Sequence, residues 1–275
     1  MLEIIKSVFF GIVEGITEWL PISSTGHMIL FNELVKLDVS DEFYEMFQVV
    51  IQLGAIMAVV ILFWKQIFPV KKEKEKFVLD KNILSLWGKI LVACIPAAII
   101  GLLFDEVFEK LFYNYVCVAL ALIVFGVAFI IIENKNKDKS SKINSLAELS
   151  YNTVFLIGVF QLIAAIFPGT SRSGATIVGA LLLGVSRTVA AEFTFFLAIP
   201  VMFGASLLKL IKFSLAFSGL ELAILLVGML VAFITSMFII KFLMNYIKKH
   251  DFKVFGYYRI ILGVIVLLYA LFQTF

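Results

Sequence analysis

Long apolar runs separated by short polar segments are the main pattern of the chain, and six of these runs suit membrane spans. A bilayer-spanning helix needs about 20 apolar residues, within a range of about 17–25. The second run is short, and Trp87 and Gly88 can extend it. The predicted spans are Phe43–Trp64, Ile90–Phe104, Tyr115–Ile132, Ala190–Leu210, Leu220–Phe242 and Gly256–Phe272.

Two further apolar segments are too short for simple spans, and each ends at a proline. A polar, hydroxyl-rich turn follows each proline, and a second short apolar piece follows the turn. Two half-length helices around a polar break predict a re-entrant hairpin, which is tolerated at membrane depth only where protein or a wet cavity shields the backbone. A kinked full span is the alternative. The paired pieces are Ser7–Leu20 with Met28–Val35, and Thr153–Phe167 with Ala175–Val185.

Positive charges gather in three of the polar segments, residues 65–89, 133–150 and 241–259. By the positive-inside rule, these segments are predicted to be cytoplasmic. Six spans then place both the N-terminus and the C-terminus outside. The opposite loops contain only Lys36, Lys110, Lys209 and Lys212.

The two proline-ended segments are similar in sequence and lie 147 residues apart. The halves that contain them, about residues 1–140 and 148–275, have opposite predicted topologies, and inverted repeats with broken helices are typical of secondary transporters. The predicted fold is therefore one polytopic domain over residues 1–275. It is an all-α integral membrane protein with six transmembrane helices plus two re-entrant helical hairpins in an inverted-topology repeat. The matched pairs are Gly11 with Gly158, Glu14 with Gln161, Pro21 with Pro168 and Ser24 with Ser171.

Two acidic residues, Glu45 and Glu192, follow the same spacing, and each opens a span. A carboxylate inside a membrane is a functional hypothesis by default. Both residues lie near the end of a span and can reach the interface, so a structural role is favoured for them.

The composition supports a membrane protein. Of the 275 residues, 62% are hydrophobic and 16% are charged, whereas soluble domains are about 45–50% apolar and about 25% charged. A signal peptide is the rival interpretation of residues 1–20, but Glu14 and Glu18 and the lack of a small-residue cleavage site argue that the segment stays in the mature chain. The net charge of +3 is modest, and no basic patch alternates with aromatic residues, so nucleic-acid binding is not expected.

Two carboxylates share one face of the first short helix. Glu14 and Glu18 are four residues apart, so they lie on the same side of a helix. Like charges in an apolar segment are costly unless a cation or a water-filled site relieves them. We therefore expect this pair to act as a general base for a hydroxyl group or as ligands of a hard divalent cation.

Hydroxyl groups crowd the turn that follows this helix. Ser23, Ser24 and Thr25 are consecutive, and His27 comes two residues later. One of these hydroxyls can simply cap the next helix, but three in a row also suit an anion held at a helix N-terminus. For His27 we expect an acid–base or phosphate-contact role, and a satisfied core histidine is the alternative.

The second turn carries a permanent positive charge at the same predicted depth. Arg172 has a planar fork that suits phosphate, and the hydroxyls of Ser171, Ser173 and Thr176 surround it in sequence. Gly169 lets the backbone approach a ligand closely. An ion pair with a carboxylate of the first turn is the alternative. Together, the two turns suit phosphoryl transfer better than movement of a neutral solute.

Both turns carry long sequence signatures. Glu14–His27 reads E-G-I-T-E-W-L-P-I-S-S-T-G-H, and Pro168–Thr176 reads P-G-T-S-R-S-G-A-T. These segments resemble the two signatures of the bacterial undecaprenyl-diphosphatases, the bacitracin-resistance family. The family patterns are E-G-x-T-E-[FW]-L-P-[VI]-S-S-T-G-H and P-G-x-S-R-S-G-A-T. No signature position departs from them, and with size and topology the resemblance covers essentially the whole chain.

The resemblance implies an enzyme of the bacterial cell membrane that removes the terminal phosphate of undecaprenyl diphosphate. This reaction recycles the lipid carrier for peptidoglycan and other wall polymers. The resemblance also implies bacitracin resistance, a site that opens to the outer side and a divalent cation, Mg²⁺ or Ca²⁺. The expected partners are the polyprenyl diphosphate lipid and the bilayer, and the sequence leaves a homodimer open.

The expected reaction divides the work between the two turns. Arg172 binds the diphosphate, while Glu14 and Glu18 hold the cation, with Glu18 as general base in the alternative scheme. Ser24 is the expected nucleophile, and attack by water stays open. His27 either relays the proton of Ser24 or protonates the leaving oxygen. The other expected substrate contacts are Ser23, Thr25, Gly169, Ser171, Ser173 and Thr176.

Other functions fit parts of the same pattern. A lipid-phosphate transporter or flippase would use the same inverted-repeat site. A type-2 lipid phosphatase of the acid-phosphatase kind needs a second histidine as nucleophile, and His250 is badly placed in a basic loop. A purely structural membrane protein leaves Glu14, Glu18 and Arg172 unexplained.

Overall fold

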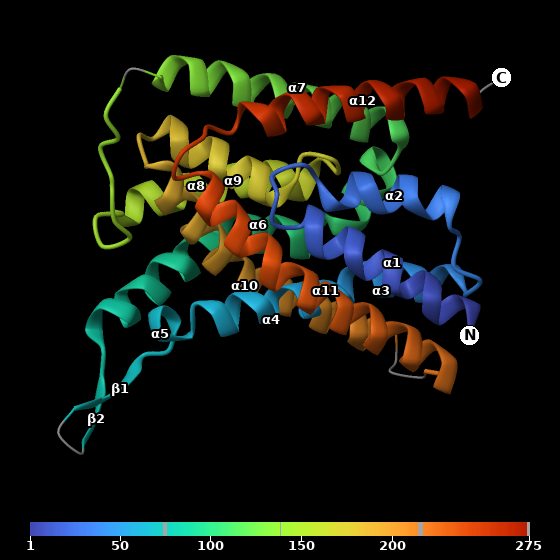
Figure 1. The fold of residues 1–275 in the computed structure, drawn as a ribbon, viewed down its shortest axis with the longest axis horizontal. Coiled ribbons are helices and arrows are strands. Elements are labelled where there is room, and N and C mark those ends of the chain that lie inside the picture. The colour runs from blue at the N-terminus through green and yellow to red at the C-terminus, as the bar shows by residue number, and fades with distance from the viewer. Residues whose placement is uncertain (74–75, 138, 214–216, 274–275) are drawn as a thin grey trace.

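Helices of very different length make up the bundle. The computed structural model describes residues 1–73, 76–137, 139–213 and 217–273 (Figure 1). Its elements are α1 (Leu2–Thr17), α2 (Ser24–Leu34), α3 (Asp41–Val50), α4 (Gln52–Leu62), α5 (Trp64–Ile67), β1 (Val70–Glu73), β2 (Lys76–Leu79), α6 (Lys81–Phe112), α7 (Tyr115–Asn136), α8 (Tyr151–Ile166), α9 (Arg172–Leu182), α10 (Arg187–Lys212), α11 (Gly219–Tyr246) and α12 (Lys253–Gln273).

The six predicted spans are confirmed as six helical segments of suitable length and hydropathy. Many of their apolar side chains point outward, as for Leu91 at 57% and Phe238 at 71% exposure, which suits a lipid-facing surface. The multi-pass membrane assignment follows. The segments are Asp41–Leu62, Lys81–Gly101, Tyr115–Asn136, Arg187–Lys212, Gly219–Tyr246 and Lys253–Phe272.

Several charges counted as loop residues from the sequence lie inside helices. Helix α6 begins at Lys81 rather than near Ile90, and the Lys89 ammonium reaches the carbonyl of Ala147 at 2.9 Å. Arg259, assigned to a basic loop, lies within α12 and is completely buried. The positive charges are therefore not all on the surface, and both Lys89 and Arg259 are buried.

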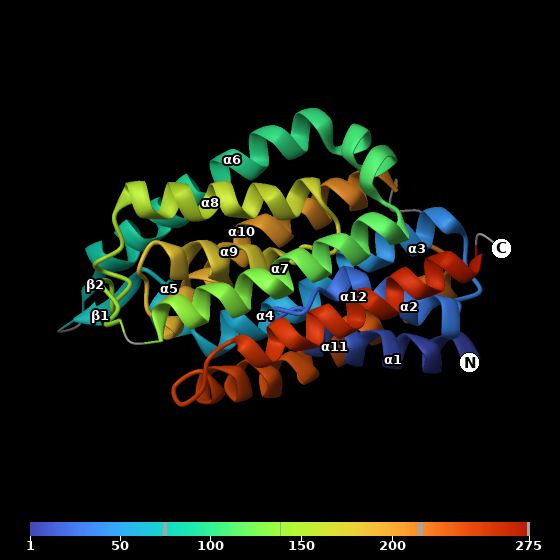
Figure 2. The same cartoon turned by 90° about the horizontal axis from the view of Figure 1, so that it is seen from above.

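The basic segment before α6 contains an element that the apolar pattern did not predict. Strands β1 and β2 form an antiparallel hairpin in which Val70 pairs with Leu79. In Figure 1 the hairpin projects from the bundle beside α5. The start of α1 and the end of α12 both lie at the opposite end of the bundle, whereas the α7–α8 and α11–α12 connections lie at the hairpin end (Figures 1 and 2).

The two pairs of short helices are present, with shifted ends. Helix α1 ends at Thr17 and α8 at Ile166, each just before the proline turn, and α2 and α9 begin directly at Ser24 and Arg172. Helix α1 packs along α11, and α8 packs along α6, while α7 and α12 lie side by side (Figures 1 and 2). The two turns thus meet inside the bundle, between long apolar helices.

A buried ion pair joins three helices near the basic end. The Glu133 carboxylate on α7 is 1% exposed, and it accepts hydrogen bonds from Arg187 Nε at 2.9 Å and from the backbone N–H of Phe252 at 3.0 Å. Arg187 opens α10, and Phe252 directly precedes α12. This carboxylate therefore holds the starts of two helices against the end of a third.

We expect Glu133→Ala to lower the free energy of unfolding by about 2 kcal/mol. Removing one partner of a buried pair costs more than this, but the Arg187 side chain is 36% exposed and water will compensate part of the loss. Thermal unfolding in detergent measures the change. Glu42→Ala, at an exposed glutamate in α3, is the control, and an equal shift for both variants would contradict the locking role.

Candidate functional site

Both proline turns end in a serine with unusual backbone geometry. Ser23 has φ 76° and Ser171 has φ 68°, and they are the only non-glycine residues with positive φ in the described part of the chain. Their side chains cap α2 and α9 by accepting the backbone N–H groups of Gly26 at 3.3 Å and Gly174 at 3.2 Å. For Ser23 and Ser171 the structure therefore gives the capping role.

The caps also correct the match between the two turns. Ser23 and Ser171 are 148 residues apart, because the second turn has one more residue between its proline and its cap. Ser24 therefore corresponds to Arg172 and not, as the sequence match had it, to Ser171. Both corresponding residues are the first residues of their helices.

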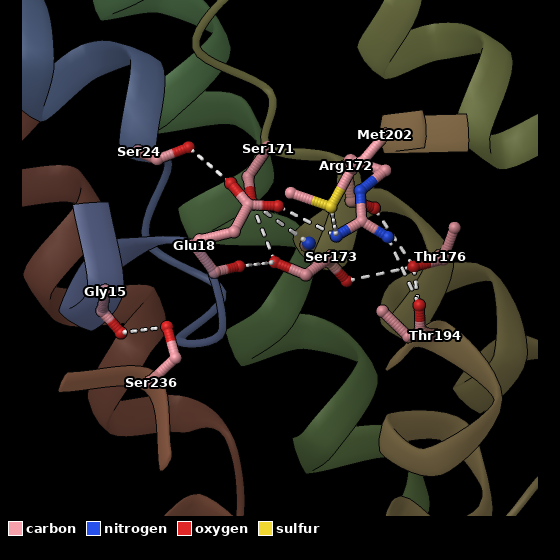
Figure 3. Close-up of polar contacts among 11 residues, drawn as sticks. Gly15, Glu18, Ser24, Ser171, Arg172, Ser173, Thr176, Thr194, Met202 and Ser236 are labelled. Atoms are coloured by element: carbon pink, nitrogen blue, oxygen red, sulfur yellow. Dashed lines mark hydrogen bonds and ion pairs between the residues drawn. The ribbon is translucent and has the colours of Figure 1, made fainter. Parts of the chain in front are cut away.

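These two residues converge on one carboxylate, Glu18 (Figure 3). Ser24 Oγ donates a hydrogen bond to Glu18 Oε2 at 2.7 Å, and Arg172 Nη2 donates to Glu18 Oε1 at 2.8 Å. Ser173 Oγ also donates to the backbone carbonyl of Glu18 at 3.3 Å. A hydroxyl bonded to a carboxylate that is itself held by a third group is the arrangement of an activated nucleophile.

Residues of α10 hold the Arg172 side chain in position. Its Nη1 donates to the carbonyl oxygen of Thr194 at 3.2 Å, and its Nη2 lies 3.9 Å from Met202 Sδ. The Thr176 hydroxyl lies 2.9 Å from the Thr194 hydroxyl and donates to the Arg172 carbonyl at 3.0 Å (Figure 3). Thr194 was not predicted as a site residue, because one threonine in an apolar span gives no signal of its own.

A cavity of about 970 Å³ leads to this group. Glu14, Ser24 and Thr25 line it, and it extends past Asp41 at the start of α3 to Lys209 near the end of α10. Glu18 and Arg172 do not line the cavity. Glu18 lies behind Ser24, to which it is hydrogen-bonded, and Arg172 is bonded to Glu18. Apolar wall residues include Met28, Ile29, Val49, Phe108, Ala164 and Ile166.

Glu14 has the chemistry of a cation ligand. It is 1% exposed, it lines the cavity, and its Oε1 is buried without a hydrogen-bond partner. An unpaired buried carboxylate oxygen is costly unless something binds it. The described residues contain no group of three or more His, Cys, Asp or Glu side chains that could hold a metal alone. The site therefore fits a hard cation that completes its shell with phosphate oxygens and water.

The structure places His27 apart from the carboxylate pair. Its Nδ1 donates to the Ser23 carbonyl at 2.7 Å, so its Nε2 accepts the Tyr258 hydroxyl at 2.8 Å, and the two rings stack 5.6 Å apart. Neither nitrogen is hydrogen-bonded to Ser24 or Glu18 among the described contacts. In this geometry His27 links the first turn to α12, and its role as a proton relay stays a prediction.

The remaining predicted residues lie either in the cavity wall or in the second proline turn. Ser171 Oγ lies 3.1 Å from Ser173 Oγ. Gly169 has φ 91°, and a Cβ there would lie 2.6 Å from the Val118 carbonyl, so the position requires glycine. Thr25 faces the cavity, where it can meet a ligand.

One residue beside both turns was missed. Arg259 was counted with the basic loops, although it falls inside the apolar run Gly256–Phe272. A charge at membrane depth is itself a signal of a functional or structural role. Its guanidinium donates to the Gly169 and Thr170 carbonyls at 3.0 and 2.7 Å.

Comparisons with known proteins agree with the two signatures. The model of the family described as bacitracin resistance protein BacA matches residues 7–265. The chain is 67% identical to an undecaprenyl-diphosphatase of Desulfitobacterium hafniense, over 98% of this chain and 96% of the relative. It is 64% identical to one of Acetivibrio thermocellus, over 98% and 99% of the two chains, and 59% identical to one of Enterococcus faecalis, over 97% of each. The chain belongs to the bacitracin resistance protein BacA family.

Proposed function

We propose that the chain is an undecaprenyl-diphosphatase of the bacterial cell membrane, which releases inorganic phosphate from undecaprenyl diphosphate and returns undecaprenyl phosphate to wall synthesis. The relatives named above carry this activity in their names. The observation that carries the proposal is the Ser24–Glu18–Arg172 arrangement at the inner end of a large cavity. It combines a nucleophile, a base and an anion-binding group.

Ser24 is the proposed nucleophile and Glu18 its general base. The 2.7 Å hydrogen bond already aligns the Ser24 proton with Glu18 Oε2. As Ser24 Oγ forms a bond to the terminal phosphorus, its proton passes to Glu18, and the anhydride P–O bond breaks to leave undecaprenyl phosphate. Water then hydrolyses the phosphoserine. In the alternative scheme, Glu18 deprotonates water directly and Ser24 orients it.

Arg172 is the proposed phosphate clamp. Its guanidinium lies beside Glu18 with its side chain 14% exposed, so a phosphate oxygen at Ser24 comes within reach of the same planar fork. The contacts to Thr194 and Met202 keep the Arg172 guanidinium in place when it binds Glu18 and a phosphate oxygen together. Ser173, Thr176 and Thr25 complete the proposed polar surroundings. The apolar part of the cavity wall, which includes Met28, Ile29 and Phe108, suits a polyprenyl chain.

A divalent cation, Mg²⁺ or Ca²⁺, completes the proposal. When bound, it would neutralise phosphate charge as the anhydride breaks. Glu14 is the residue best able to hold it, because one oxygen is free, whereas both Glu18 oxygens have partners. Glu18 would join as a second ligand by sharing one of its oxygens.

The proposed architecture is an inverted repeat with two re-entrant hairpins. The packing of α1 on α11 and of α8 on α6, and the shared serine caps, support it. The hairpin and the basic connections at one end support a cytoplasmic assignment for that end. The cavity extends toward the end of the bundle where α1 starts and α12 ends. It would then open to the outer side, with both termini outside.

Phosphate release from C55 diphosphate by the purified chain tests the function. We expect release that depends on a divalent cation, and an Arg172→Ala rate lower by about 100-fold, as for loss of one charge-stabilising donor. Lys241→Ala, at an exposed lysine near the end of α11, should change the rate little. Equal rates for wild type and Arg172→Ala would refute the site, and no release from a folded wild type would favour lipid transport instead.

A further inference from the structure

A buried guanidinium bridges the two proline turns. Arg259 on α12 has no exposed surface. Its Nη1 donates to the Pro21 carbonyl of the first turn at 3.2 Å, and its Nη2 donates to the Gly169 and Thr170 carbonyls of the second turn at 3.0 and 2.7 Å. One rigid group thus holds backbone from segments almost 150 residues apart.

The surroundings of Arg259 offer carbonyl oxygens and a ring instead of a counter-charge. Its Nε donates to the Leu122 carbonyl on α7 at 3.4 Å, and its guanidinium lies 5.8 Å from the centre of the Phe125 ring. No carboxylate forms an ion pair with it within the described ranges. An unneutralised buried charge is costly. The carbonyl oxygens therefore have to compensate the charge of Arg259, and the planar guanidinium suits this because it can donate to several carbonyls at once.

We infer that Arg259 is a positioning residue that sets the separation of the two turns, and so brings Ser24 and Arg172 together on Glu18. This inference rests on the proposed function for its kinetic consequence, although not for the bridge itself. Ser24 comes three residues after Pro21, and Arg172 two residues after Thr170. A change in the separation of the clamped carbonyls therefore moves the nucleophile relative to the phosphate clamp.

Two neighbouring features support this inference. A Cβ at Gly174 would lie 2.8 Å from Arg259 Nη1, so this glycine leaves the space that the guanidinium fills. Tyr258, the residue before Arg259, bonds to His27 just after the first turn. Helix α12 thus holds the first turn at both ends, through Pro21 and through His27.

Hydrogen exchange of the full chain in nanodiscs, without substrate, tests the bridge directly. In Arg259→Leu, peptides covering residues 20–27 and 168–176 should both exchange at least about 10-fold faster than in wild type, as expected for a segment that opens locally. Arg259→Lys should fail to restore both turns, because one ammonium lacks the fork. Lys241→Leu, at an exposed lysine of α11, is the control for loss of a positive charge and should leave both peptides unchanged. Unchanged exchange of the two turns in Arg259→Leu would overturn the inference.

Kinetics and a second variant keep the test independent of folding and of the proposed activity. If Arg259→Leu does not fold, Gly174→Ala displaces the guanidinium while keeping the arginine, and Gly204→Ala, whose methyl group meets open space, is its control.

In both the Arg259→Leu and the Gly174→Ala variants, kcat should fall by about 100-fold with KM within about 3-fold, as for misplaced reacting groups. A rise in KM alone would contradict positioning. Faster exchange of both turns in a chain whose wild type releases no phosphate would support the bridge and refute the proposed function.

Discussion

Glu18→Gln is expected to lower kcat for phosphate release by about 1,000-fold, within the range for loss of a general base. The amide keeps the size of the side chain but cannot accept the Ser24 proton. It also ends the ion pair with Arg172, whose Nη2 lies 2.8 Å from the carboxylate. Steady-state phosphate release from C55 diphosphate measures the change.

Controls separate the role of Glu18 from loss of structure. Glu148→Gln, at an exposed glutamate in the α7–α8 connection, should retain wild-type turnover. Ser24→Ala should fall by a similar factor to Glu18→Gln, and near-wild-type turnover of Ser24→Ala would contradict the covalent scheme. Turnover of Glu18→Gln within about 10-fold of wild type would contradict the assignment of the base.

Gly54→Ala is expected to have the largest effect on stability, a loss of about 3 kcal/mol in the free energy of unfolding. A methyl group at Gly54 on α4 would overlap the backbone carbonyl of Met229 on α11. Backbone cannot move aside as a flexible side chain can, so the two helices must separate. Thermal unfolding in detergent should show a midpoint about 10 °C lower.

Gly101→Ala gives the matched comparison for this glycine. Its Cβ would meet nothing within 4 Å, and Gly101 lies inside α6. Alanine there should stabilise the helix by about 0.5–1 kcal/mol, because glycine is unfavourable in a helix interior. Both substitutions add one methyl group. A lower free energy of unfolding for Gly54→Ala and a higher one for Gly101→Ala would therefore attribute the loss at Gly54 to its contact with α11. A Gly54→Ala midpoint within 2 °C of wild type, roughly 0.5–1 kcal/mol, would show that α4 and α11 can separate without cost.

The apolar pattern predicted the six spans and the two short helix pairs because long runs of one character leave few alternatives. It did not predict the β1–β2 hairpin, which is built from a lysine-rich segment without a clear two-residue alternation. The ends of α6 were also misplaced, since Lys81 and Lys89 were read as loop when only their charges, and not their helical spacing, were considered.

The site was predicted by residue type better than by contact. The sequence identified Glu18, Ser24 and Arg172, but placed Arg172 on substrate and gave its ion pair with Glu18 only as the alternative. Sequence alone cannot reveal that His27 would meet Tyr258, because 231 residues separate them. Arg259 was detectable as a charge inside an apolar run, and counting it with the nearby lysines concealed that signal.

The ion pair between Glu18 and Arg172 has a consequence for inhibitors. An anionic compound that takes Arg172 away from Glu18 competes with a carboxylate of the same molecule, held at high effective concentration. A simple phosphonate that displaces Glu18 leaves that carboxylate without its partner, and the lost contact subtracts from affinity. A zwitterionic head group, with an anion for Arg172 and an ammonium for Glu18, replaces both halves of the pair at once. Selective ligands for this protein would therefore carry both charges side by side, and not the negative charge alone.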